Sequence, residues 1–230
     1  PLPTTSRPTN KPTTSQPSSS PTPNNPYFFG EEFVTVPELG IEMSAGLKVK
    51  LIARTGRKVQ YANGDESDRS WHTNSDAAGI IPLDDGGYVY MSNSEAENGG
   101  VYGLYFNSEG EITEYKALLT GTTDNCGGGL TPWGTWVSCE EESDVGQCWQ
   151  VSPDGRAEET VLGGDGGNFE SVAVDDRIYD APVFYTTEDE EDGALRRFVA
   201  SQHGWNALHS EGEHSFLHLL DDGTFEWTLV

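Results

Sequence analysis

Short runs of alternating hydrophobic and polar residues recur along most of the chain. Alternation with a period of two is typical of half-buried strands. It predicts strands over residues 48–54, 78–83, 88–93, 101–107, 112–119, 134–141, 148–153, 171–176, 183–188, 196–200, 216–220 and 225–230. No segment shows a sustained helical period, and a short turn near 205–209 is the most that the pattern allows. The sequence therefore predicts an all-β protein.

Polar turn sequences such as DDGG, NSEG, SPDG and LDDG separate these runs. Gly, Asn and Asp are suited to them because they tolerate the left-handed backbone of hairpin turns. Successive hairpins fit a β-sandwich or a β-propeller, and the repeated strand, turn, strand units favour the propeller. At about four strands per blade, the predicted strands make about three to four blades, fewer than most closed rings contain. We therefore expect a partial β-propeller ring.

The first 26 residues, PLPTTSRPTNKPTTSQPSSSPTPNNP, differ in composition from the rest because they contain no acid and almost no large hydrophobic residue. Such a segment cannot bury enough surface to offset its ordering entropy. We expect residues 1–26 to form a disordered stalk or linker, and residues 27–230 to form one β-propeller domain that is truncated at its C-terminal end. No hydrophobic run approaches the ~20 residues of a membrane span.

The chain is strongly acidic, with 38 Asp and Glu residues against 13 Lys and Arg residues and a net charge of −25. Nucleic acid is an unsuitable partner, because a phosphate backbone needs Lys and Arg to replace its counterions. The charge favours divalent cations as partners, or solubility in salty surroundings.

The chain contains three cysteines, Cys126, Cys139 and Cys148, and this odd number excludes a fully paired disulfide framework. Cys139 and Cys148 could close a hairpin disulfide in an oxidising compartment. Cys126 would then be the free thiol. It could be a buried inert side chain, or a thiolate ligand of a transition metal.

Carboxylates gather where hydrophobic strands end. Glu140 and Glu141 end one predicted strand, Glu170 stands just before another, and 188–192 (EDEED) follows a third. Alternation points only one of two adjacent glutamates toward a given site. Each acidic run can be a solvated turn or can bind a cation, since carboxylate oxygens suit calcium.

Several common catalytic motifs are absent from the sequence: the HExxH zinc motif, the G-x-S-x-G elbow and the G-x-x-x-x-G-K-[ST] phosphate loop. Trp133 and Trp136 are expected in the core, because large aromatic residues mainly supply buried area.

The segment 125–141, NCGGGLTPWGTWVSCEE, closely resembles the signature of the PhoX-type alkaline phosphatase family. Upstream, WHTNSDAAGIIPLDDGGYVYMSNSE is similar to an early blade of that family. Downstream, GGNFESVAVDD, PVFYTTEDEEDGALRRF, GWNALHSEGE and GTFEWT also resemble it. The resemblance covers residues 40 to 230.

This resemblance implies a secreted or periplasmic phosphomonoester hydrolase on a β-propeller, which uses iron and calcium and a metal-bound oxygen nucleophile. Its partners would be a small phosphate-ester substrate and divalent and trivalent metal ions. It implies that Cys126 is the thiolate ligand of iron and that Glu141 is a calcium-side carboxylate. Glu170 and Asp189 would be further metal ligands.

Glu95 and Glu188 also lie in matching motifs and are further candidate metal ligands, to which the resemblance assigns no particular metal. The chain departs from many family members at Ser94 and Phe169, where a histidine is common. It also ends before later family motifs that carry an arginine and further acids. Three alternatives stay open: a non-catalytic acidic calcium-binding extracellular module, a different calcium-dependent propeller hydrolase such as a lactonase, and a stalked wall or matrix protein.

Overall fold

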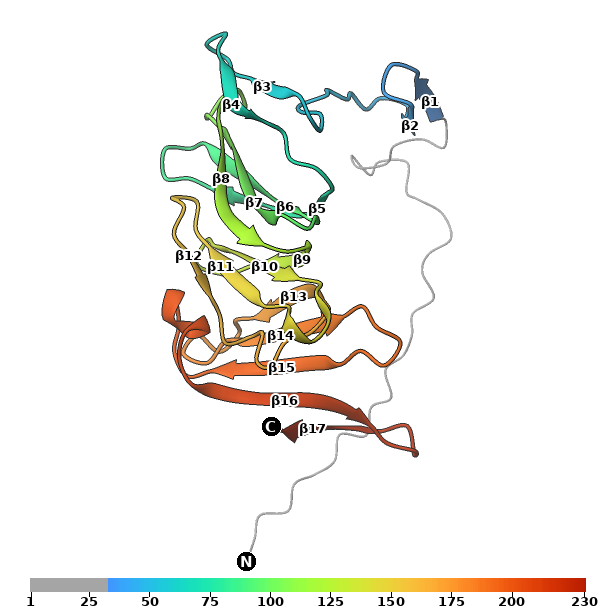
Figure 1. The fold of residues 1–230 in the computed structure, drawn as a ribbon, viewed down its shortest axis with the longest axis vertical. Coiled ribbons are helices and arrows are strands. Elements are labelled where there is room, and N and C mark those ends of the chain that lie inside the picture. Colours follow the sequence, from blue (N-terminus) through green and yellow to red (C-terminus); the bar gives the residue numbers. More distant parts are fainter. Residues whose placement is uncertain (1–32) are drawn as a thin grey trace, which may run out of the picture. The chain divides into compact units, whose positions relative to one another are not determined.

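The computed structural model describes residues 33–230 of the chain (Figure 1). The predicted stalk of residues 1–26 lies outside the described residues. The chain divides into two compact units, Pro1–Leu51 and Ile52–Val230. The described part of the first unit contains an antiparallel hairpin of β1 (Phe33–Val36) and β2 (Ile41–Ser44). The predicted domain limits at residues 26 and 27 stay a prediction.

The regular secondary structure of the second unit is almost entirely β-strand, which confirms the predicted all-β class. Two short 3-10 helices, η1 (Ser143–Val145) and η2 (Trp205–Leu208), lie in its connections. Its strands are β3 (Lys58–Gln60), β4 (Glu66–Ser70), β5 (Ser75–Pro82), β6 (Tyr88–Ser94), β7 (Gly99–Phe106), β8 (Ile112–Thr122), β9 (Asn125–Leu130), β10 (Trp136–Glu140), β11 (Cys148–Val151), β12 (Ala157–Glu159), β13 (Phe169–Asp175), β14 (Val183–Glu188), β15 (Leu195–Ala200), β16 (Gly212–Leu219) and β17 (Phe225–Leu229).

Three antiparallel meanders, β5–β8, β9–β12 and β13–β16, follow one another from green to red in Figure 1. In each, strands that are neighbours in sequence are neighbours in the sheet, as in a propeller blade. β9 and β13 pair in parallel where Gly128 lies opposite Ser171, so the second and third meanders and β17 form one nine-stranded sheet. Among residues 33–230 no sheet closes into a ring. We call β5–β6, β9–β10 and β13–β14 the leading hairpins.

Every strand predicted between residues 78 and 230 is present, with ends that differ by a few residues. The predicted strand 48–54 is wrong, because residues 47–54 form no strand and leave Val49 and Leu51 exposed. An alternating run becomes a strand only where a neighbour satisfies its backbone hydrogen bonds. The predicted short turn near 205–209 is η2.

Three consecutive glycines favour a turn, and the sequence alone predicts that the chain turns at Gly127, Gly128 and Gly129. That prediction is wrong, because residues 125–130 form a strand, β9. None of Gly127, Gly128 and Gly129 has a positive φ angle. A Cβ atom on Gly127 would overlap the carbonyl group of Glu170, and one on Gly129 would overlap that of Val172. Gly127 and Gly129 therefore let β9 and β13 approach closely. Close approach of another backbone is a common reason for glycine within a strand.

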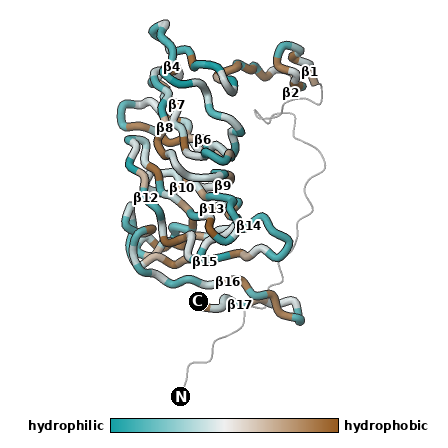
Figure 2. The backbone as a smooth tube through the Cα atoms, in the orientation of Figure 1, coloured by the Kyte–Doolittle hydropathy of each residue, from teal (hydrophilic) through white to brown (hydrophobic). Residues whose placement is uncertain are grey.

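The hydrophobic stretches in Figure 2 largely follow the strands, whereas hydrophilic stretches mark many of the turns. Trp136 is 3% exposed and packs among residues of the first and second meanders, including Ile81 and Val151. Trp133 is partly buried against a second cluster that includes Phe184. The predicted core positions of both tryptophans are confirmed.

Candidate metal centre

The three leading hairpins repeat one arrangement of backbone and side chains. The second residue of the first strand is Asp76 in β5, Cys126 in β9 and Glu170 in β13. The residue that follows the second strand is Glu95 after β6, Glu141 after β10 and Asp189 after β14. Each hairpin thus presents a thiol or carboxylate on its first strand and a carboxylate just beyond its second strand, both at the same end of that hairpin.

One backbone hydrogen bond recurs at this end of each leading hairpin. The donor is the N–H of the residue that follows the second strand. The acceptor is the carbonyl of the residue that lies two positions before the thiol or carboxylate of the first strand. The three bonds are Glu95 to Asn74, Glu141 to Asp124 and Asp189 to Asn168, each 2.9 Å long. Asn74 and Asp124 have φ angles of 43° and 39°, in the left-handed region that Asn and Asp tolerate. The backbone therefore fixes the strand ends that carry the acids.

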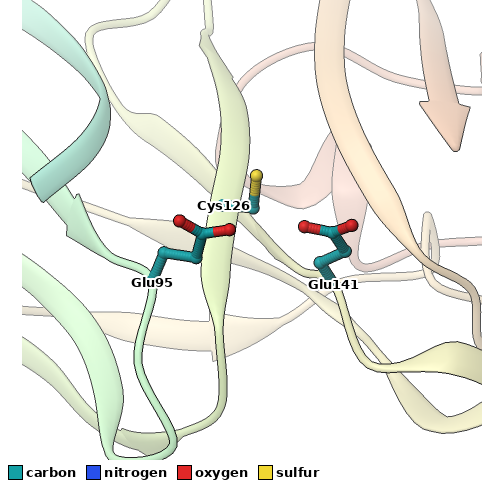
Figure 3. Close-up of side chains that lie close together, drawn as sticks. All are labelled: Glu95, Cys126 and Glu141. Carbon is teal, nitrogen blue, oxygen red and sulfur yellow. The ribbon is translucent and has the colours of Figure 1, made fainter. Parts of the chain in front are cut away.

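Three of these side chains converge on one point, as Figure 3 shows. One ligand atom from each of Glu95, Cys126 and Glu141 lies within 4.8 Å of the other two. Cys126 is only 5% exposed, and both glutamates are half-buried. The structure therefore brings together one predicted ligand from the first meander and two from the second.

The Cys126 thiol lies among carboxylates. Its Sγ atom donates a hydrogen bond of 3.2 Å to Oε2 of Glu170. Burial raises the pKa of this thiol far above its ordinary value, and hydrogen bonding to Asp76 and Glu170 raises the pKa further. Without a cation the thiol is protonated, and both neighbouring carboxylates favour that state.

The Glu95 carboxyl group experiences the same crowding of negative charge. Its pKa is raised, first by burial and then by the charges of the surrounding carboxylates, which are Asp76, Glu141, Asp124 and Glu170. Like charges that share a site disfavour ionisation, and a bound cation reverses that effect.

Three further residues of the predicted site lie outside this group of three: Glu170, which contacts the Cys126 thiol, and Asp189 and Glu188. Asp189 follows β14 at the position equivalent to Glu141, and it is exposed. Glu188 accepts a hydrogen bond of 2.7 Å from the N–H of Ala194 and forms an ion pair with Arg196. The carboxylate of Glu188 is therefore already occupied by a cationic partner.

Sequence analysis missed Asp76 and Asp124, and a repeated signal could have found them. Asn or Asp stands two residues before each ligand-type residue of the first strands, in the segments NSD, DNC and NFE. Aligning these segments would have placed Asp76 at the position of Cys126 and Glu170.

The two departures from the family pattern are buried side chains with partners inside the protein. Phe169 is fully buried, and the guanidinium of Arg196 lies 4.7 Å from the centre of its ring. Ser94 donates a hydrogen bond of 2.8 Å from its hydroxyl to the carbonyl of Thr73.

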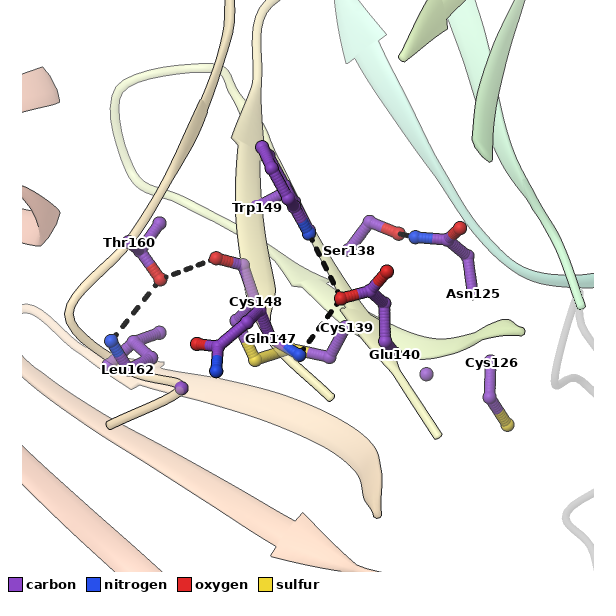
Figure 4. Close-up of a disulfide and its surroundings, with 12 residues drawn as sticks. Asn125, Cys126, Ser138, Cys139, Glu140, Gln147, Cys148, Trp149, Thr160 and Leu162 are labelled. Carbon is purple, nitrogen blue, oxygen red and sulfur yellow. Dashed lines mark hydrogen bonds between the residues drawn. A yellow bond between two sulfur atoms is a disulfide. The ribbon is translucent and has the colours of Figure 1, made fainter. Parts of the chain in front are cut away.

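Cys139 and Cys148 form a disulfide between β10 and β11, where they lie directly opposite each other (Figure 4). Both are fully buried. Of the two possibilities that the sequence left for these residues, the structure contains the hairpin disulfide, and Cys126 is the free cysteine.

Comparisons with known proteins agree with this fold. The family model described as alkaline phosphatase PhoX matches residues 107–178, which include Cys126, Glu141 and Glu170. The fold is similar to that of Pseudomonas fluorescens PhoX in complex with vanadate, a transition state analogue. That match has a TM-score of 0.61 and 13% sequence identity, and it covers 81% of this chain and 55% of that one. A search of curated protein sequences gave no significant match.

The predicted resemblance to the PhoX-type family and the predicted β-propeller fold are therefore confirmed. The chain spans about half the length of the PhoX structure that it matches. No helix in residues 33–230 has the length and hydrophobicity needed to cross a membrane.

Proposed function

We propose that this chain forms part of a metal-dependent phosphomonoester hydrolase of the PhoX type. The observation that carries the proposal is the convergence of the Cys126 thiol with the Glu95 and Glu141 carboxylates. They meet in a fold shared with Pseudomonas fluorescens PhoX, whose structure is a complex with vanadate, a transition state analogue. The substrate would be a small phosphate ester.

The donor atoms of this group fit the metals that we propose, iron and calcium. A thiolate is a soft ligand that suits iron and that calcium does not use, whereas carboxylate oxygens suit calcium. Cys126 would hold iron, Glu141 and Glu95 would hold the calcium side, and Glu170 and Asp189 would complete the set. When bound, such ions supply Lewis-acid stabilisation of negatively charged phosphate oxygens.

The chain's own residues prepare the site for cations. The Glu170 carboxylate accepts a hydrogen bond from the Cys126 thiol, with 3.2 Å between Sγ and Oε2, so it can receive the thiol proton when the sulfur becomes a ligand. Burial of Cys126 keeps bulk water away from the sulfur. The repeated backbone bonds from Glu95 and Glu141 fix the backbone positions from which both carboxylates extend.

We also propose that the protein works outside the cytoplasm, in the periplasm or as a secreted protein. The buried Cys139–Cys148 disulfide supports this location, because disulfides persist mainly in oxidising compartments.

The test is release of phosphate from p-nitrophenyl phosphate after the protein is loaded with iron and calcium. We expect turnover by the wild-type protein, and its loss in Cys126→Ser and Glu141→Gln. Glu142→Gln is the matched control, because Glu142 is the next residue along the chain and its carboxylate makes no hydrogen bond within residues 33–230.

A wild-type protein that binds iron and calcium but releases no phosphate would contradict the proposal. Metal analysis adds a second criterion, since calcium without iron would favour the calcium-binding module or a different calcium-dependent hydrolase.

A further inference from the structure

We propose that Glu140 is a positioning residue that holds Cys126 and Glu141 in register at the metal centre. This inference rests on the proposed function, because it concerns the same site. Glu140 directly precedes Glu141, yet its side chain takes no part in the group formed by Glu95, Cys126 and Glu141.

The Glu140 carboxylate is buried, with 8% of the residue exposed, and it binds neutral donors. Its Oε1 atom accepts a hydrogen bond of 2.8 Å from the N–H of Thr123. Its Oε2 atom accepts bonds of 3.0 Å from the N–H of Gln147 and 3.3 Å from Nε1 of Trp149; Figure 4 draws these two bonds. Within residues 33–230 it forms no ion pair. Burying a carboxylate is costly unless such bonds offset the cost.

These three donors come from the segments that lead into the two strands beside β10: Thr123 precedes β9, which carries Cys126, and Gln147 and Trp149 lie at the start of β11. Thr123 stands just before Asp124, whose carbonyl accepts the backbone N–H of Glu141 at 2.9 Å. Cys126 follows three residues after Thr123. Gln147 lies opposite Glu140 in the connected pair of strands β10 and β11, and its carbonyl accepts a hydrogen bond of 2.9 Å from the N–H of Glu140. One carboxylate thus links the segment that leads into Cys126 to the hairpin that presents Glu141.

The strand geometry explains why adjacent glutamates have different roles. Successive residues of a strand point to opposite sides, so Glu140 turns away when Glu141 faces the centre. The pairing of β9 with β10 shifts register between Ser138 and Glu140. Such bulges bend a strand and redirect side chains near functional sites.

The other leading hairpins also use the last residue of their second strand as a tether. In β14 this residue is Glu188, bound by Ala194 and Arg196. In β6 it is Ser94, whose hydroxyl donates to Thr73. The same position therefore fixes neighbouring backbone in all three hairpins, which supports a positioning role for Glu140.

Glutamine at position 140 cannot reproduce these bonds. A carboxylate has two accepting oxygens, and here both are used, whereas an amide has one. The amide nitrogen of Glu140→Gln would face either the Thr123 N–H or the pair from Gln147 and Trp149. Either the segment before β9 or the start of β11 would lose its hydrogen bond to residue 140. The distance between Cys126 and Glu141 would then no longer be fixed. Loss of a residue that orients a metal ligand typically weakens metal binding by about 10- to 100-fold.

The test is a titration of the metal-free protein with cobalt(II), followed by the thiolate-to-cobalt charge-transfer absorption. We expect Glu140→Gln to weaken binding by about 10-fold or more and to change the intensity of the band, whereas Glu142→Gln should match wild type. Circular dichroism and melting of the metal-free proteins report folding separately. A role in stability alone would lower the melting temperature and leave the band and the affinity unchanged.

The outcomes distinguish this inference from the proposed function. A wild-type protein with no thiolate band would contradict the metal centre itself, and this inference with it. A wild-type band that Glu140→Gln leaves unchanged in affinity and intensity would contradict the inference alone. If Glu140→Gln does not fold, Trp149→Phe decides, because it removes one of the three donors: weaker cobalt binding than in Glu142→Gln supports the inference, and equal binding overturns it.

Discussion

The leading hairpins β9–β10 and β13–β14 have the same backbone plan and hold their paired acids differently. Each ends in two adjacent acids. The side chain of the first acid is hydrogen-bonded within the protein, and the second acid points to the opposite side of the strand. Glu140 binds only neutral N–H groups, whereas Glu188 binds the guanidinium of Arg196. Glu141 joins the cluster with Cys126, whereas Asp189 is exposed.

This difference affects the electrostatic field at the centre. Arg196 compensates the charge of Glu188, whereas the Glu140 carboxylate has only neutral hydrogen-bond partners and stands one residue before Glu141. An uncompensated buried charge acts over a longer range than a solvated one, because the surrounding dielectric constant is lower. Glu140 therefore adds to the attraction of cations on the β9–β10 side, and the β13–β14 side lacks that contribution.

The largest effect is expected where the two hairpins approach each other. In Gly127→Ala the new Cβ atom would overlap the backbone carbonyl of Glu170. Backbone cannot move aside as a flexible side chain can, so β9 and β13 would separate. We expect a loss of about 3 kcal/mol or more in the free energy of unfolding, measured by urea denaturation.

Gly121→Ala is the control for this substitution. Gly121 has a φ angle of +82°, and no atom lies within 4 Å of the position that a Cβ atom would take there, so alanine adds only backbone strain. That strain should cost about 1 kcal/mol. Equal losses in the two variants would show that the close approach of β9 and β13 is not what requires Gly127.

The second prediction compares the two hydrogen-bonded glutamates, Glu188 and Glu140. Glu188→Gln leaves the largely buried Arg196 guanidinium without its carboxylate. Removing one member of such a pair typically costs about 3 kcal/mol. Because Glu140 has only neutral partners, Glu140→Gln should cost about 2 kcal/mol. Urea denaturation measures both, with the exposed Glu190→Gln as control. A Glu188→Gln variant as stable as that control would remove the distinction between the tethers.

Much of the fold could be predicted from local pattern. From residue 78 onward, each predicted strand is present and pairs with at least one neighbouring strand. The same pattern failed at residues 48–54, where no strand lies alongside. Local sequence states which residues can form a strand, and pairing partners that are distant in sequence decide whether they do so.

The site was less predictable, for a related physical reason. The thiol of Cys126 and the carboxylate of Glu141 belong to one motif, and their proximity follows from one hairpin. Asp76 reaches the same thiol from a strand some fifty positions earlier, which only the packing of separate meanders can bring about. The roles of Glu140 and Glu141 depend on a register shift, and composition carries no signal for it.

The remaining leading hairpin, β5–β6, allows a pH-dependent test with a smaller expected change in stability, because the neutral side chain of His72 forms hydrogen bonds to both of its strands. His72 bonds to the hydroxyl groups of Tyr115, Ser92 and Ser75 at 3.0 to 3.1 Å. Burial lowers the pKa of His72 from 6.5 to about 4. The folded state therefore favours neutral imidazole, and this contribution to stability is complete above pH 6.5 and is lost as the pH falls toward about 4.

We expect the urea midpoint of the wild-type protein to fall between about pH 7 and about pH 5. The midpoint of His72→Gln should be lower at pH 7 and should change less over this range, since glutamine does not titrate. Parallel curves for the two proteins would show that other groups cause the acid destabilisation.

The smallest expected signal concerns Cys126, which occupies on β9 the position that Glu170 occupies on β13. The thiol is buried and its pKa is raised by burial, and reactivity toward disulfide reagents requires exposed thiolate. Ellman's reagent should therefore find almost no thiol in the native metal-free protein. After denaturation without reductant it should find the single free cysteine, since Cys139 and Cys148 are paired. Rapid reaction of the native protein, absent in Cys126→Ser, would mean that this side of the centre is open to solvent, unlike the buried thiol described above.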